Sequence, residues 1–189
     1  MQTDRLHLNK TTWIATTVML ASVVAVLEFG RLPPRIPFPL MPILKFDIVG
    51  IPMIVAYNLL GLGSGILTSI VSFAIIATRD PFSGAMKTLA EAASILGAWI
   101  IMRRPQLNLS WKRKSLAIIS SVAVRTIVTT VANVLLLPIF MGRFYPTSEA
   151  VMVIIPLLAA FNIIQGAISV IGGLLIYEGI KKRIPILRS

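Results

Sequence analysis

Several uncharged polar side chains lie within the most apolar stretches of this sequence. Asn162, Gln165 and Ser169 are spaced i, i+3 and i+7, which places them on one face of a predicted helix. Asn133 lies toward the end of the preceding apolar run. Because amides offer both hydrogen-bond donors and acceptors, this set suits a neutral heteroaromatic ligand better than a bare ion. The alternative, that these groups only bond neighbouring helices, remains open.

Two residues of opposite charge are also expected at membrane depth. Arg125 lies near the middle of one apolar run, and Glu91 lies several residues into another. Charges in such positions are costly unless they are paired, so Glu91 is the predicted partner of Arg125. A structural ion pair is favoured over direct contact between Arg125 and an anionic ligand.

A proline-rich segment, 34–47, interrupts the apolar sequence and ends in the triplet Lys45-Phe46-Asp47. Prolines 37, 39 and 42 disfavour helical geometry in the residues before them. We therefore expect residues 30–45 to form a long irregular loop. Phe46, or Phe161 in the last apolar run, could stack on a flat ligand held beneath this loop.

The sequence lacks the residues that several kinds of catalysis require. It contains no cysteine, and His7 is its only histidine, which argues against thiol and Ser-His catalysis and against zinc or iron sites. No Gly-Lys pair occurs, so there is no P-loop for nucleotide phosphates. A lipid-phosphate enzyme would need clustered carboxylates, whereas the acidic residues form no D-x-x-x-D pair: Asp4, Glu28, Asp47, Asp80, Glu91, Glu149 and Glu178. We expect neither enzyme activity nor a metal or cofactor.

The composition indicates an integral membrane protein. Of the 189 residues 56% are hydrophobic and only 13% are charged, with a mean hydropathy of +0.87. The apolar runs are long enough for helices that cross a bilayer, and they lack the alternating polarity of barrel strands. We predict an all-α bundle of six transmembrane helices in a single domain, 1–189, with helices at 13–29, 47–60, 63–78, 84–102, 115–140 and 149–177. The first run is interpreted as a helix rather than a cleaved signal peptide because no small-residue cleavage site follows it.

The basic residues predict the orientation of the bundle. The net charge of +11 reflects short basic segments between apolar runs, which favours membrane orientation over nucleic-acid binding. With the N-terminus inside, most of them become cytoplasmic: Arg5, Lys10, Arg103, Arg104, Lys112, Arg113, Lys114, Lys181, Lys182, Arg183 and Arg188. The outer connections receive Arg31, Arg35, Arg79 and Arg143. Both termini are therefore predicted to be cytoplasmic, and the segment 34–47 to face outward.

Three segments resemble the substrate-binding S components of energy-coupling factor (ECF) vitamin transporters, most closely the riboflavin-specific type. Residues 44–66 resemble the family's Leu-Lys-φ-Asp pattern, followed by a proline and a glycine-rich turn. Residues 133–138 resemble its Asn-Tyr-φ-φ-φ-Pro segment, and residues 160–166 its Pro-Phe-Asn-φ-φ-Lys-Gly segment. These segments occur in the family's order and at comparable spacing, so the resemblance covers nearly the whole chain.

The resemblance implies a multi-pass subunit of a prokaryotic cell membrane, surrounded by lipid, that binds one vitamin near its outer surface. The implied ligand-binding residues are Lys45, Phe46, Asp47, Asn133, Phe161, Asn162 and Gln165. The first long loop would close over the site. The implied partners are a transmembrane coupling subunit and two cytoplasmic ATPases, which an Ala-x-x-x-Ala-like face, here Ala21 and Ala25, would contact. Small residues at this spacing allow close helix approach, although alone they are equally compatible with intramolecular packing.

The chain also departs from the riboflavin-type pattern. Gln165 replaces a lysine, Ser72-Phe73 replaces a Lys-Asn pair, and Arg125 has no counterpart. Riboflavin is the first candidate ligand, and another vitamin or vitamin precursor is the alternative. A small intramembrane enzyme and a facilitator without ATPase partners are the other functional classes compared.

Overall fold

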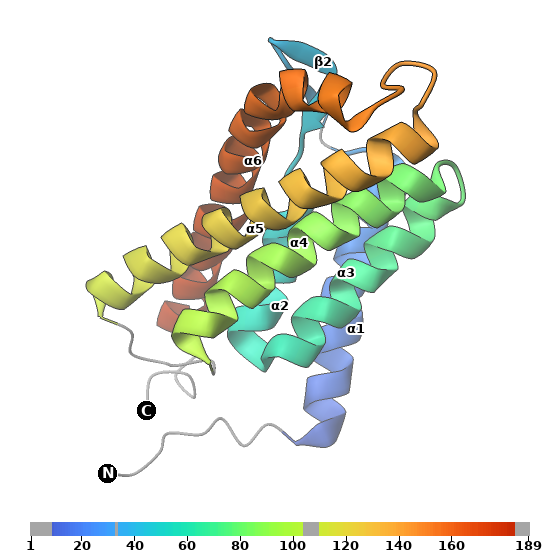
Figure 1. The fold of residues 1–189 in the computed structure, drawn as a ribbon. Helices are drawn as coiled ribbons and strands as arrows, with labels where there is room; N and C mark the ends of the chain where they lie inside the picture. Colours follow the sequence, from blue (N-terminus) through green and yellow to red (C-terminus); the bar gives the residue numbers. More distant parts are fainter. Residues whose placement is uncertain (1–8, 33, 104–109, 184–189) are drawn as a thin grey trace.

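The computed structural model describes residues 9–32, 34–103 and 110–183, which form a bundle of helices with a short hairpin at one end (Figure 1). The elements in chain order are α1 (Lys10–Gly30), β1 (Ile36–Phe38), β2 (Met41–Phe46), α2 (Gly50–Leu60), α3 (Leu62–Ala77), α4 (Pro81–Met102), α5 (Trp111–Phe140) and α6 (Ser148–Arg183). The start of α1 and the end of α6 lie at the end of the bundle opposite to β2.

The lengths of the helices divide them into two groups. Among the described residues, α1, α4, α5 and α6 are long and apolar enough to cross a membrane. The helices α2 and α3, of 11 and 16 residues, are shorter. At 1.5 Å per residue α2 spans roughly 17 Å, about half of a bilayer core. The extended residues of β2, which precede α2, complete this passage through the molecule.

Local sequence signals explain where the helices begin and end. Asp80 caps α4 by accepting a hydrogen bond from the Ser83 backbone N–H, and Pro81 takes the first helical position. Asn9 caps α1 in the same way. Gly61 adopts a φ of 94° between α2 and α3, a conformation that glycine accepts without a steric penalty.

Two helices extend beyond the apolar runs that predicted them. Helix α5 begins at Trp111 rather than Ser115, and α6 continues to Arg183 rather than ending at Tyr177. The additional turns carry charged side chains, so hydropathy did not reveal them. Lys114 in the added turn of α5 and Glu178 in the added part of α6 form an ion pair at 2.6 Å.

The prediction of a long irregular loop over residues 30–45 was wrong. The strands β1 and β2 pair in antiparallel fashion, with Ile36 opposite Phe46 and Pro37 opposite Lys45, and the register shifts between Pro37 and Phe38. Prolines are tolerated because this two-stranded ribbon leaves one edge of each strand unpaired. The bundle is thus helical apart from this hairpin.

The solid core and the hairpin occupy different ends of the bundle. The largest buried apolar cluster includes Met102 at the end of α4, Ala117 near the start of α5 and Leu174 in the last third of α6. Its centre is formed by Met53, Ile54 and other side chains that are almost completely buried. The hairpin end has a smaller buried cluster, formed by Leu137, Val151 and Leu158 and packed against Met41 and Leu44 of β2.

Candidate functional site

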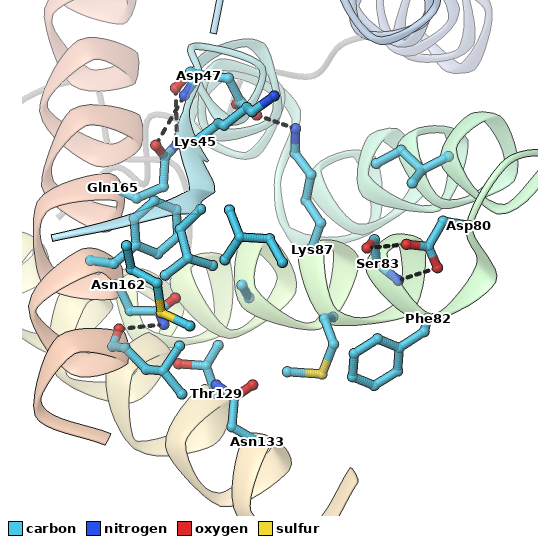
Figure 2. Close-up of a pocket in the computed structure, with 18 of the residues that line it drawn as sticks. Lys45, Asp47, Asp80, Phe82, Ser83, Lys87, Thr129, Asn133, Asn162 and Gln165 are labelled. Atoms are coloured by element: carbon cyan, nitrogen blue, oxygen red, sulfur yellow. Dashed lines mark hydrogen bonds and ion pairs between the residues drawn. The ribbon is translucent and has the colours of Figure 1, made fainter. Parts of the chain in front are cut away.

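A cavity of about 640 Å³ lies beneath the hairpin and is lined by residues of β2, α1, α3, α4, α5 and α6. Its volume is within the range of small-molecule sites. The apolar lining includes Met41, Met86, Leu137 and Leu158, and polar groups line it from four helices, α1, α4, α5 and α6, and from the hairpin (Figure 2). Of the residues predicted from sequence, all but Phe46, Ser169, Ala21 and Ala25 line this cavity: Lys45, Asp47, Glu91, Arg125, Asn133, Phe161, Asn162 and Gln165.

The side chain of Gln165 holds the hairpin against α6. Its Oε1 accepts a hydrogen bond from the Asp47 backbone N–H at 3.1 Å, and its Nε2 donates to the Asp47 carbonyl at 2.9 Å. The Asp47 carboxylate accepts from the Val49 N–H. Non-helical backbone inside a membrane protein must find such partners. Gln165 both donates to and accepts from the Asp47 backbone. The lysine found at this position in the riboflavin-type pattern could only donate, because lysine cannot accept a hydrogen bond.

The other two predicted amides, Asn162 and Asn133, differ in whether they already form hydrogen bonds within the protein. Asn162 donates through Nδ2 to the Leu158 carbonyl at 2.9 Å and accepts from Arg125 Nε at 3.4 Å. Asn133 has no hydrogen-bond partner within the described residues, although it is 92% buried. Figure 2 shows Asn133 on α5 close to Thr129. Asn133 is therefore the amide with donors and acceptors left for a ligand.

Arg125 and Glu91 lie in direct contact between α5 and α4. Arg125 Nη1 is 2.8 Å from Glu91 Oε1, and both side chains are at least 97% buried. The same nitrogen donates to Ser94 Oγ at 3.3 Å. Oε2 of Glu91 is buried without a hydrogen-bond partner among the described residues. The arrangement is a structural ion pair that also forms part of the cavity wall.

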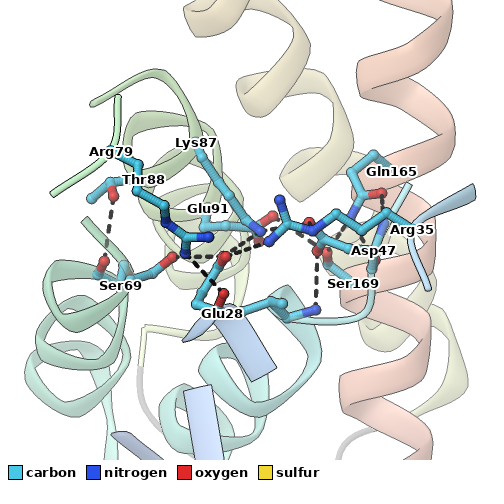
Figure 3. A network of polar contacts seen from close by, with 12 residues as sticks. Glu28, Arg35, Asp47, Ser69, Arg79, Lys87, Thr88, Glu91, Gln165 and Ser169 are labelled. Carbon is cyan, nitrogen blue, oxygen red and sulfur yellow. Dashed lines mark hydrogen bonds and ion pairs between the residues drawn. The ribbon is translucent and has the colours of Figure 1, made fainter. Parts of the chain in front are cut away.

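A second buried carboxylate, Glu28 near the end of α1, anchors the hairpin to the helices (Figure 3). Its oxygens lie 2.5 Å from Arg35 Nη2 and 2.5 Å from Lys87 Nζ, and Ser72 also donates to it. Lys87 Nζ is likewise 2.5 Å from Asp47 Oδ2. Lys87 thus joins α4 to both α1 and the end of β2.

Three phenylalanines connect the hairpin to α6. Phe46 stacks on Phe161 with ring centroids 5.0 Å apart, and Phe38 contacts both rings at 5.7 and 5.9 Å. Phe161 also lines the cavity, whereas Phe46 does not. Stacking of Phe46 on Phe161 accordingly helps to hold the hairpin over the cavity, and Phe161 is the ring available to a ligand.

Sequence reasoning missed several cavity residues. Glu28 was counted only among the acidic residues, and Arg35 and Arg79 were interpreted only as outer-loop charges. No role was predicted for Lys87. The usable signal was the presence of Glu28 and Lys87 within apolar runs, where an unpaired charge is costly.

Asp80 is held at the edge of the cavity by its role as a helix cap. Its carboxylate accepts hydrogen bonds from both the side chain and the backbone N–H of Ser83. These hydrogen bonds, the side-chain one foremost, lower the pKa of Asp80 below its usual value. Asp80 therefore remains charged and is directed toward the start of α4.

Ala21 and Ala25 lie on α1, do not line the cavity, and are partly exposed. Val18 and Phe29, which lie one turn away on the same face of the helix, are more than half exposed. This face of α1 is therefore free to contact lipid or another protein within the described part of the chain.

Two comparisons with known proteins identify the same family. The family model described as the ECF transporter substrate-specific component matches residues 13–177. A solved structure described as the S component of a bacterial ECF transporter is 26% identical, with a TM-score of 0.76 over 94% of this chain and 99% of that chain. A search of curated proteins gives no match.

Proposed function

Because this chain belongs to the family of ECF transporter substrate-specific components, we propose that it captures a vitamin-sized heteroaromatic compound at the outer membrane surface, with riboflavin as the first candidate. As a family member it is a substrate-binding membrane subunit and not an enzyme. It works with a transmembrane coupling component and ATPases, which supply the nucleotide hydrolysis that its own sequence cannot.

The proposed topology has six transmembrane segments with both termini in the cytoplasm of a prokaryote. Its support is that α1 begins and α6 ends at the same end of the bundle, where Lys112, Lys182 and Arg183 also lie. Arg5, Arg104 and Arg188, which contribute to the same charge argument, lie outside the described residues. In this orientation the cavity and hairpin face outward.

The observation that carries the proposal is a cavity lined by polar groups that form no hydrogen bond with the described protein. Asn133 is buried, lines the cavity and lacks a protein partner among the described residues. Phe161 presents an aromatic ring to the same space. We propose that these two residues contact the ligand and that Lys45 lies at the entrance. Asp47, Gln165 and Phe46 hold the hairpin in place. Asn162 fixes the Arg125 side chain.

Replacement of Asn133 by leucine is expected to weaken riboflavin binding by about tenfold, because one buried hydrogen-bonding group of the site is lost. The measurement is quenching of flavin fluorescence on titration of purified protein. Asn58→Leu is the matched control, since Asn58 is also a buried amide but bonds only the Ile54 carbonyl and does not line the cavity. No quenching by the wild type at micromolar riboflavin would remove riboflavin as the ligand.

Docking of the coupling subunit is proposed to occur on the α1 face that carries Ala21 and Ala25. Ala21→Trp is expected to abolish co-purification of the coupling subunit, because the indole prevents close helix approach. Ile127→Trp is the control, as Ile127 is exposed on α5, away from this face. Equal recovery of the coupling subunit with both variants would place the docking surface elsewhere.

A further inference from the structure

The charges around the cavity are not balanced, and the excess is positive. The cationic lining residues are Arg31, Arg35, Lys45, Arg79, Lys87 and Arg125. The acidic lining residues are Glu28, Asp47, Asp80 and Glu91. Cations therefore outnumber carboxylates in a space that otherwise suits a flat organic molecule.

The ion pairs use up the carboxylates deep in the site. Glu28 is paired with Arg35 and Lys87, Asp47 with Lys87, and Glu91 with Arg125 (Figure 3). Asp80, the remaining carboxylate, is directed to Ser83 at the start of α4. Asp80 keeps its negative charge, so the six cations of the lining exceed its four carboxylates by two.

Three cations remain without a carboxylate within the described part of the chain. Arg79 donates one hydrogen bond, to the Glu28 backbone carbonyl at 3.1 Å, which fixes its side chain at the cavity. The side chains of Lys45 and Arg31 have no hydrogen-bond or ion-pair partner among the described residues. Lys45 reaches the same end of the cavity as Asp47 and Lys87 (Figure 2). A cavity rim with surplus positive charge attracts anions and can form charge-assisted hydrogen bonds with them.

We propose that the transported substrate carries an acidic group, a carboxylate or a phosphate, that binds Lys45 and Arg79 at the mouth of the cavity while its apolar or aromatic part lies against Phe161. This inference rests on the proposed function, and it selects the acid-bearing members of the heteroaromatic class over free riboflavin. Arg31 contributes to the same positive field from the end of α1.

Riboflavin and riboflavin 5′-phosphate are matched probes for this proposal, because they share one ring system and differ by a phosphate. In detergent without added lipid, the phosphate is expected to bind the wild type about tenfold more tightly, the effect of one hydrogen bond to a charged group. Lys45→Gln with Arg79→Gln should abolish this preference, so that the two flavins bind the double variant with equal affinity. Arg143→Gln is the control, since Arg143 is exposed and does not line the cavity.

The outcomes separate this inference from the proposed function. Equal or tighter binding of riboflavin would overturn the inference and leave the function intact, with the rim cations then solvated or occupied by lipid headgroups. If the protein binds neither flavin, the inference is tested by identifying, by mass spectrometry, the compound that the purified protein releases. A released compound with a carboxylate or phosphate supports the inference although the flavin assignment fails. A released neutral compound contradicts it.

Discussion

Replacement of Glu91 by leucine is expected to lower the free energy of unfolding by about 3 to 5 kcal/mol, because it leaves the buried Arg125 guanidinium without its counter-charge. The pair lies between α4 and α5 at 2.8 Å with both side chains almost fully buried. Thermal unfolding of the purified protein in detergent measures this effect. The double variant Glu91→Leu with Arg125→Leu should recover most of the loss, since neither charge then remains in the apolar interior.

The ion pair of Glu178 with Lys114 supplies the matched control. It has a similar separation, 2.6 Å, but its side chains are 31% and 21% exposed. Glu178→Leu is expected to cost no more than about 1 kcal/mol, because water replaces the lost partner. If Glu91→Leu proved as mild as Glu178→Leu, Arg125 would have to be free to bind something other than Glu91.

Gly97→Ala is expected to destabilise the protein by about 1 to 3 kcal/mol through steric overlap. A Cβ atom at Gly97 would lie 2.6 Å from both the Ser120 carbonyl oxygen and the Ser121 Cα, so the backbones of α4 and α5 would have to separate. These are the helices that bring Glu91 and Arg125 together. The variant should therefore also weaken substrate binding.

Gly179 near the end of α6 offers the same substitution without the overlap. No atom lies within 4 Å of a Cβ placed there. Gly179→Ala should leave the unfolding temperature unchanged or raise it slightly, because alanine is a better helix former than glycine. Equal effects of the two alanine variants would show that α4 and α5 do not approach as closely as the structure places them.

The sequence predicted the helices well because long apolar runs leave few alternatives in a membrane. It did not predict the hairpin, because prolines 37, 39 and 42 are poor strand residues and only the pairing of β1 with β2 reveals their arrangement. The charged ends of α5 and α6 were missed for the opposite reason, since hydropathy fades where a helix leaves the apolar zone.

The cavity could be predicted only in part. Asn133, Asn162 and Gln165 were found because amides are conspicuous in apolar runs, and all three line it. Their different roles depend on partners far away in sequence: Gln165 bonds the backbone of Asp47, and Asn162 bonds Arg125. The contacts of Glu28 with Arg35 and Lys87 likewise join separate elements, and no local pattern specifies such pairs.

The central claim is that the space beneath the hairpin is the substrate site. Its most direct test is an experimental structure of the purified chain determined together with the small molecule that co-purifies with it. The account predicts that this molecule occupies the cavity, in contact with Asn133 and Phe161, while Gln165 still holds Asp47. A molecule bound elsewhere, with the cavity filled by the chain's own side chains and Asn133 bonded to protein, would contradict the account.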